Sequence, residues 1–124
     1  MTDRCPCGLG EPYDTCCGPF HRGEREAPTA VALMRSRYSA FARYDDEYLL
    51  ATWHPTTRPR FLDLDREQRW THLEVLSQTG GTPFESTGTV EFRAHYRRPG
   101  ERDHLYEISH FVRERGSWLY VSPS

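Results

Sequence analysis

Four cysteines stand close together near the start of the chain, in two pairs separated by eight residues. Thiolate sulfur is the ligand type that zinc favours in structural sites, and four such ligands complete a tetrahedral shell. Gly8 and Gly10 let the backbone between the two pairs turn tightly. We therefore predict a closed Zn²⁺ site that leaves no coordination position for catalysis. Its predicted ligands are Cys5, Cys7, Cys16 and Cys17.

The second pair is unusual because the side chains of adjacent residues normally point apart. Cys16 and Cys17 can bind one ion only if the backbone twists between them, and the Gly18-Pro19 that follows is compatible with such a twist. His21 is the reserve ligand if one of the cysteines does not reach the ion. The alternatives to a metal site are a strained disulfide within the adjacent pair, or four ordinary thiols.

The 124 residues suffice for one domain core with a small appendage. The hydrophobic fraction of 36% is low, but three Trp, seven Tyr and six Phe supply large side chains for a core. No stretch is apolar enough for a membrane span, and the N-terminus lacks the apolar run of a secretory signal. We therefore expect a cytoplasmic, thiol-reducing location, where clustered cysteines indicate metal or redox chemistry. The net charge of −2 gives no sign of a polyanion-binding protein.

The chain has two parts that differ in composition and in hydrophobic periodicity. Residues 1–26 are rich in Gly, Pro and Cys and show no helical or alternating period, so they need a metal ion to hold them. From Pro28 onward, apolar residues recur at three- and four-residue spacing, which predicts a helix capped by Thr29 and ending near Tyr44.

A second, short helix is expected after Asp45 or Asp46, running through Trp53 and ended by Pro55. Asp65 can cap one more helical turn. The period then switches to two, with turn residues between the segments, which predicts an antiparallel sheet. Its strands are expected at 70–76, 90–96, 105–113 and 118–121. Helices followed by a sheet indicate the α+β class.

The cysteine segment carries a resemblance. The pattern C-P-C-G-x-G-x-x-Y-x-x-C-C over residues 5–17 resembles the SEC-C motif, a small zinc knuckle found at the C-terminal end of the SecA translocation ATPase and on many bacterial proteins. The fourth ligand of that family, Cys or His, corresponds to Cys17. Leu9 departs from the serine usual there, but it is not a ligand position.

The rest of the chain resembles the YchJ-like family of uncharacterised bacterial proteins through residues 33–41, 48–55, 111–114 and 118–121. The resemblance implies a knuckle over 1–26. Over 27–124 it implies a nuclear-transport-factor-2-like domain in which a curved, cone-shaped antiparallel sheet packs on helices, as in cystatin-like and SnoaL-like proteins. It brings no known activity.

A curved sheet closed by helices encloses a hollow, which is a common place for a ligand. Period two puts Glu107 and Ser109 on one face of their strand, and the family resemblance favours that face as inward. A buried carboxylate needs a partner. One interpretation is a buried Arg37–Glu107 pair that ties helix to sheet. The other makes Glu107 a general base in a pocket shaped by Tyr38, Trp53 and His54.

His54 is expected at a helix C-terminus, where it caps the last carbonyls or titrates near neutral pH. The other strand and turn histidines, His72, His95, His104 and His110, show no metal-ligand spacing. Arginines around one predicted hairpin, at 93, 97, 98 and 102, raise nucleic-acid binding as a possibility. Interleaved acidic residues argue against it.

Two hypotheses of function follow. The first is a zinc-binding protein whose knuckle is a structural and partner-docking module, attached to a small α+β domain that binds a ligand or forms a dimer. The second is an enzyme of the hydrolase or isomerase class that acts on a small molecule in the pocket through Glu107 or His54. Association with nucleic acid is a third, weaker alternative.

Overall fold

A computed structural model describes residues 3–123, so residues 1–2 and 124 of the two expected domains lie outside the described part. The elements follow in the order η1 (Tyr13–Thr15), α1 (Gly18–His21), α2 (Ala30–Ala42), α3 (Asp46–Ala51), β1 (Arg69–Gly80), β2 (Thr87–Arg98), β3 (Glu101–Glu114) and β4 (Ser117–Pro123). The strands form one antiparallel sheet in the order β1-β2-β3-β4. The predicted α+β class is confirmed.

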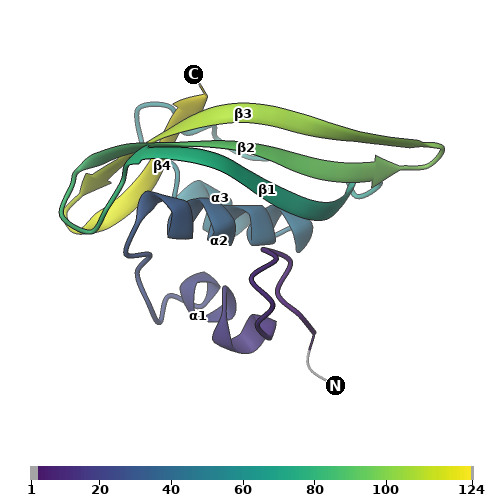
Figure 1. The fold of residues 1–124 in the computed structure, drawn as a ribbon, viewed down its shortest axis with the longest axis horizontal. Coiled ribbons are helices and arrows are strands. Elements are labelled where there is room, and N and C mark those ends of the chain that lie inside the picture. The colour runs from purple at the N-terminus through teal and green to yellow at the C-terminus, as the bar shows by residue number, and fades with distance from the viewer. Residues whose placement is uncertain (1–2, 124) are drawn as a thin grey trace.

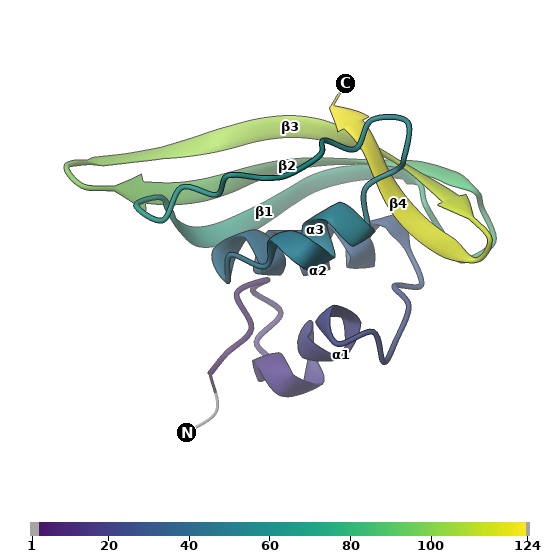
Figure 2. The same ribbon diagram turned by 180° about the vertical axis from the view of Figure 1, so that it is seen from behind.

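The molecule has three layers. The sheet curves over α2 and α3, and the N-terminal segment with η1 and α1 lies on the opposite side of α2 (Figures 1 and 2). Register shifts in β1 and β4 contribute to the curvature, because an extra residue in one strand bends it and increases its twist. None of the helices described between residues 3 and 123 is both long and apolar enough to cross a membrane.

Helix α2 begins as the sequence predicts, because the Thr29 side chain accepts a hydrogen bond from the Ala32 amide at 3.1 Å. Its apolar side, with Leu33 and Met34, packs into the main core beneath the sheet. Its other side carries Ser36 and Ser39, and neither serine is exposed to solvent. The helix is therefore buried on two sides, by the sheet and by the N-terminal segment.

Strand β2 shows the expected alternation, since Val90, Phe92 and Ala94 are buried in the core. On β3 the buried residues are Ser109 and Phe111. The face that carries them points toward the helices, because Phe111 belongs to the same core cluster. The strands extend beyond the predicted bounds at both ends, and long stretches of their outer face are exposed.

Two local predictions are wrong. Helix α3 stops at Ala51 because the backbone then pairs with β4: the Tyr120 amide donates to the Thr52 carbonyl at 2.8 Å, and Trp53 forms a parallel bridge to Tyr120. Asp65 caps no helical turn. Its side chain accepts from the Glu67 amide at 2.9 Å in a local turn that leads directly into β1.

Candidate metal centre and adjoining cavity

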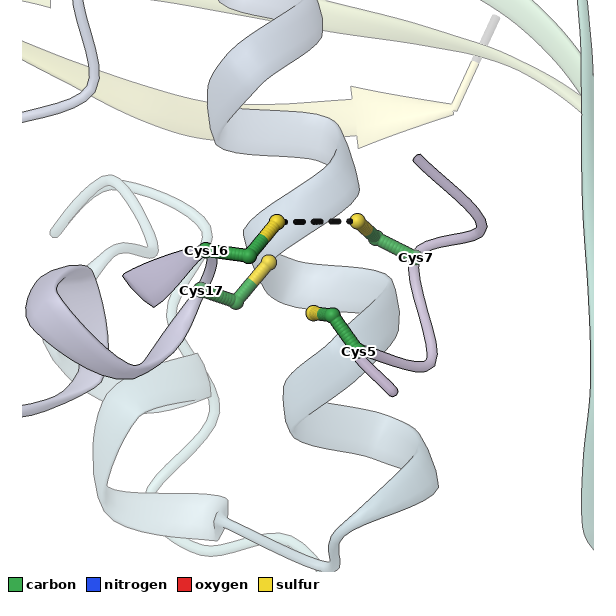
Figure 3. Close-up of side chains that lie close together, drawn as sticks. All are labelled: Cys5, Cys7, Cys16 and Cys17. Atoms are coloured by element: carbon green, nitrogen blue, oxygen red, sulfur yellow. Dashed lines mark hydrogen bonds between the residues drawn. The ribbon is translucent and has the colours of Figure 1, made fainter. Parts of the chain in front are cut away.

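The sulfur atoms of the four cysteines converge on one point. They come from two separate segments and point toward one another in front of α2 (Figure 3), and all of them lie within 4.8 Å of one another. Ligands about 2.3 Å from a tetrahedral zinc stand about 3.8 Å apart. The 3.5 Å between the sulfurs of Cys7 and Cys16 is close to that separation. All four thiols are free, so the residues present fit a thiolate-bound metal ion.

The backbone of the N-terminal segment holds the two pairs face to face. Arg4 and Pro12 form an antiparallel bridge, and the Cys5 amide donates to the Glu11 carbonyl at 2.8 Å. The turn between them contains Gly8 and Gly10, both at a positive φ that other residues adopt only with strain. This hairpin-like loop positions the first cysteine pair.

The second pair owes its shared direction to an irregular backbone. Cys16 ends η1 with a ψ of −95°, and Cys17 returns to helical angles before α1. Such a change at one residue rotates the next side chain relative to its neighbour. The twist that adjacent ligands require is therefore present at the expected position.

The protonation of the thiols shows how crowded the site is. Hydrogen bonds from the thiols of Cys17 and Cys7 lower the pKa of Cys5. The hydrogen bond between the thiols of Cys17 and Cys5 in turn raises the pKa of Cys17. Burial raises the pKa of Cys16 to about 12. One thiolate can form in this cluster at the expense of the others, and a bound cation would be needed to stabilise all four negative charges.

His21 is not available as a reserve ligand. Its Nε2 lies 2.8 Å from the Ser36 carbonyl oxygen, which only accepts, so Nε2 carries the proton. Its Nδ1 then accepts from the hydroxyl of Tyr13 at 2.6 Å. With its side chain 3% exposed, His21 joins the N-terminal segment to α2. Sequence reasoning could not find this role because α2 supplies the partner.

The described part of the knuckle, residues 3–26, contains the four cysteines. Besides His21, further contacts attach it to α2 and to Arg43, the residue that follows this helix. The Arg35 guanidinium donates to the Cys7 carbonyl at 3.0 Å, and the thiol of Cys5 lies 3.5 Å from the Ser39 hydroxyl. The guanidinium of Arg43 lies 3.8 Å from the centre of the Tyr13 ring. Cys5, Cys7 and Cys17 are buried in this contact.

Behind α2, on the side of the sheet, lies a cavity of about 250 Å³. Five of the six predicted pocket residues line it: Arg37, Tyr38, Trp53, Glu107 and Ser109. The sixth, His54, is not among the lining residues. Its ring nitrogens contact the Thr56 hydroxyl at 2.7 Å and the Glu114 carboxylate at 3.0 Å, and its amide donates to the Tyr120 carbonyl, so it caps no helix.

The predicted ion pair between Arg37 and Glu107 is wrong. Nη1 of Arg37 donates to the Leu49 carbonyl and to the Thr52 hydroxyl, both at 2.7 Å. Glu107 instead accepts from the hydroxyls of Ser109 and Tyr120. The end of α3 takes the guanidinium because its last carbonyls need donors.

Tyr120 is a polar residue of the cavity lining that the sequence did not indicate. The Arg37 guanidinium lies 4.6 Å from the centre of its ring, and its hydroxyl donates to Glu107 Oε2 at 3.1 Å. The ring therefore stands between the two charged groups. Its alternation with Trp118 on β4 gave the only sequence signal of its inward direction.

Two clusters of polar side chains lie on the surface, one of histidines and one of arginines. On the outer face of the sheet, the rings of His72 and His95 stack at 3.9 Å with 8° between their planes, and His95 Nε2 lies 2.5 Å from Glu74 Oε1. His72, Glu74 and His95 thus bring possible metal ligands within 4.8 Å of one another, which the sequence spacing did not indicate. This group is partly or fully exposed, whereas three of the four cysteines are buried. In the arginine-rich region around the β2–β3 turn, Arg98 pairs with Asp65 at 2.6 Å.

The architecture defines a class: an N-terminal cysteine knuckle packed on an NTF2-like α+β domain. Residues 1–19 match the SEC-C motif, and residues 29–123 match the family described as YchJ, middle NTF2-like domain. The chain belongs to the YchJ-like family, whose bacterial relatives carry the name UPF0225.

Relatives cover nearly the whole chain. A UPF0225 protein of Streptomyces avermitilis is 56% identical over 94% of this chain and 81% of its own length, and one of Streptomyces coelicolor is 56% identical over 97% and 94%. The solution structure of a SEC-C motif containing protein from Rhodopseudomonas palustris matches with a TM-score of 0.85 at 38% identity, covering 98% of each chain. A crystal structure of a SEC-C motif containing protein from Psychrobacter arcticus matches with a TM-score of 0.79 at 31% identity, covering 98% of this chain and 82% of its own. The predicted family resemblance is confirmed.

Proposed function

We propose that the protein binds one structural Zn²⁺ through Cys5, Cys7, Cys16 and Cys17, and that the zinc-bound knuckle is a docking module for a protein partner on a small α+β binding domain. The observation that carries the zinc proposal is the convergence of four free thiols within 4.8 Å, three of them buried. Four protein ligands fill a tetrahedral shell, which supports a structural rather than a catalytic role.

The knuckle needs the ion because it has little core of its own. Its buried cluster consists of Cys5, Cys7 and Cys17, with Tyr13 and Cys16 packed against them. Without a cation, the side chains at the centre of this cluster are mutually repelling thiolates or poorly packed thiols. A zinc ion would supply the missing stabilisation and keep the knuckle fixed against α2.

The docking proposal is supported by the outer side of the knuckle. Leu9, at the tip of the turn between Gly8 and Gly10, is 58% exposed. An apolar side chain held at the tip of a metal-stabilised turn gains free energy when a partner covers it, by about 25 cal/mol for each Å² removed from water. The side of the knuckle toward α2 is occupied, so a partner would use this outer side.

The zinc content of the purified protein tests the metal proposal, and a pull-down of protein partners tests the docking proposal. The native protein purified without added metal should contain one zinc per chain, and a Cys7→Ser/Cys16→Ser variant should lose it. Leu9→Ser is the matched control, because it changes the exposed tip and keeps every ligand. A Leu9→Ser protein that retains zinc and no longer recovers the partner supports docking. Equal recovery by all three proteins contradicts docking, and zinc-free native protein contradicts the metal site.

Catalysis in the cavity is the less favoured function. His54, one of the two candidate bases, points to Glu114 and is outside the cavity lining. The other, Glu107, already accepts hydrogen bonds from the hydroxyls of Ser109 and Tyr120. These contacts suit a residue that positions a ligand better than one that removes a proton.

A further inference from the structure

Three histidines form one row across the outer face of the sheet. In the strand register, His72 of β1 pairs with His95 of β2, and His95 pairs with His104 of β3. Residues directly opposite in an antiparallel pair carry their side chains on the same face. The ring centres of His72 and His95 are 3.9 Å apart, and that of His104 lies 5.5 Å from that of His95. The fold thus gathers imidazoles from three strands.

An irregularity in β1 decides which residue joins this row. The register steps from Trp70, which packs against the core, to His72, so that Thr71 is an extra residue. Without this shift, Thr71 would stand opposite His95. Bulges re-aim side chains in this way and are common beside functional sites. The irregularity therefore brings the rings of His72 and His95 together.

Glu74 adds a carboxylate to the same face. Its Oε1 lies 2.5 Å from Nε2 of His95, and the ligand atoms of His72, Glu74 and His95 all lie within 4.8 Å of one another. In a tetrahedral zinc shell with bonds of about 2.1 Å, the ligand atoms stand about 3.4 Å apart. His72 is exposed and the other two are partly exposed, so their side chains can rotate. A modest rotation closes the set around one ion.

Two imidazoles and one carboxylate form a donor set for a divalent transition-metal ion. Imidazole nitrogen suits Zn²⁺, and two histidines with one glutamate are among the sets that hold zinc in proteins. Ca²⁺ and Mg²⁺ instead prefer oxygen ligands. Three protein ligands leave one tetrahedral position to water, so an ion bound here would remain accessible to solvent.

Neighbouring arginines limit the affinity for a cation. Nη1 of Arg93 lies 4.0 Å from the same Glu74 oxygen, and Arg97 and Arg102 line the hollow beside the histidines. Asp103 lines the hollow too and offsets part of their charge. A positive charge at about 4 Å opposes a cation even in water. The ion is therefore expected to bind more weakly than in a site of four thiolates and to exchange with solvent.

We propose that His72, Glu74 and His95 bind one exchangeable Zn²⁺ on the outer face of the sheet, with water completing its shell. The ion would replace the hydrogen bond between Glu74 and His95 and would link β1 to β2. This face points away from α2 and the knuckle (Figure 1), so the two zinc proposals can fail independently.

Titration of Zn²⁺ into native protein already equilibrated with one equivalent tests the site. Calorimetry should show one further saturable site with a Kd of about 10–100 µM. The imidazole nitrogen signals of His72 and His95 in a long-range ¹H–¹⁵N spectrum should shift with the same midpoint. His110 is the internal reference, since it lies on the same face of β3 and outside the group. These signals identify the site whatever the knuckle binds.

Variants distinguish this set from general zinc binding by exposed histidines. His95→Gln should weaken binding at least about tenfold and Glu74→Gln about tenfold, with unchanged thermal stability because surface pairs contribute little. His110→Gln is the matched control and should bind as the native protein does. Arg93→Gln should bind about two- to fivefold more tightly, since it removes the opposing charge.

Four results would overturn the inference. The first is that no saturable binding below about 1 mM shifts the signals of His72 and His95. The second is that His95→Gln binds as tightly as the native protein, and the third is that His110→Gln weakens binding as much as His95→Gln does. The fourth is weaker binding by Arg93→Gln, which would show that the ion lies elsewhere.

Discussion

Replacement of His21 by Phe separates a structural histidine from a metal ligand. The ring of His21 is buried and packs 4.6 Å from that of Tyr48, so Phe retains most of the apolar contact. It removes both hydrogen bonds, to the Ser36 carbonyl and from the Tyr13 hydroxyl. The carbonyl belongs to the hydrogen-bond ladder of α2 and keeps that role, whereas the half-buried hydroxyl loses its acceptor.

Together these losses should lower the free energy of unfolding by about 2 kcal/mol, because each net hydrogen bond is worth about 1 kcal/mol. Urea unfolding followed by tryptophan fluorescence measures the global effect. Hydrogen exchange of the Arg22 amide, which donates to the Gly18 carbonyl at 2.9 Å, measures local release of the knuckle. Tyr13→Phe is the control and should cost about half as much, since it removes one of the two bonds.

The zinc content decides between the two roles of His21. With the four cysteines as ligands, His21→Phe should still contain one zinc per chain, whereas Cys16→Ser should lose affinity for the metal. If His21→Phe lost its zinc and Cys16→Ser kept it, the ligand assignment would be wrong. A His21→Phe protein as stable as the native one, with unchanged exchange at Arg22, would refute the attachment of the knuckle through this ring.

Two further predictions concern packing and pH. A Cβ on Gly88 would stand 2.6 Å from the Gly81 Cα, so Gly88→Ala should lower stability by about 1–3 kcal/mol in thermal unfolding. Gly100, with open space around it and a positive φ, is the control, and Gly100→Ala should lower stability by about 1 kcal/mol or less. If the two variants lost the same stability, the close approach of Gly88 to Gly81 would be unimportant. Burial raises the pKa of Tyr48 to about 12 and also raises that of Tyr38. The stability that these two protonated hydroxyls contribute to the fold is therefore complete below about pH 10 and is lost as the pH rises through the raised pKa values. The lowered pKa of Arg37 acts in the opposite direction and offsets only part of this loss. Alkaline unfolding should therefore begin above about pH 10 and coincide with tyrosinate absorbance at about 295 nm; Tyr48→Phe should make it less steep, and an unchanged profile would contradict the reasoning.

Helix α2 connects the two candidate sites. Ser36 and Ser39 face the knuckle, while Arg37 and Tyr38, their neighbours in sequence, line the cavity on the side of the sheet. Small polar side chains let the knuckle approach the helix closely, and larger ones reach into the cavity. A helix buried on both sides cannot show a simple apolar stripe, which explains why its spacing predicted a helix but not its second contact.

Local signals in the sequence were sufficient for several features. Thr29 predicted the start of α2 because a helix N-terminus needs an acceptor for its free amides, and this requirement is met within three residues. The alternation around Phe92 predicted a strand with one buried face. The predicted end of α3 failed because pairing of Thr52 with Tyr120, on the last strand, competes with the helix.

The cysteine set, the family and the α+β class could be predicted from the sequence, because ligand spacing, turn glycines and hydrophobic period are properties of neighbouring residues. The partners of His21, Arg37 and Glu107, in contrast, depend on how distant elements pack together. Each of them bonds to whichever group packing brings nearest, and here those groups are the Ser36 carbonyl, the end of α3 and the Tyr120 hydroxyl. A charged or polar side chain needs a partner in any fold, but its residue type does not specify which distant element will supply it.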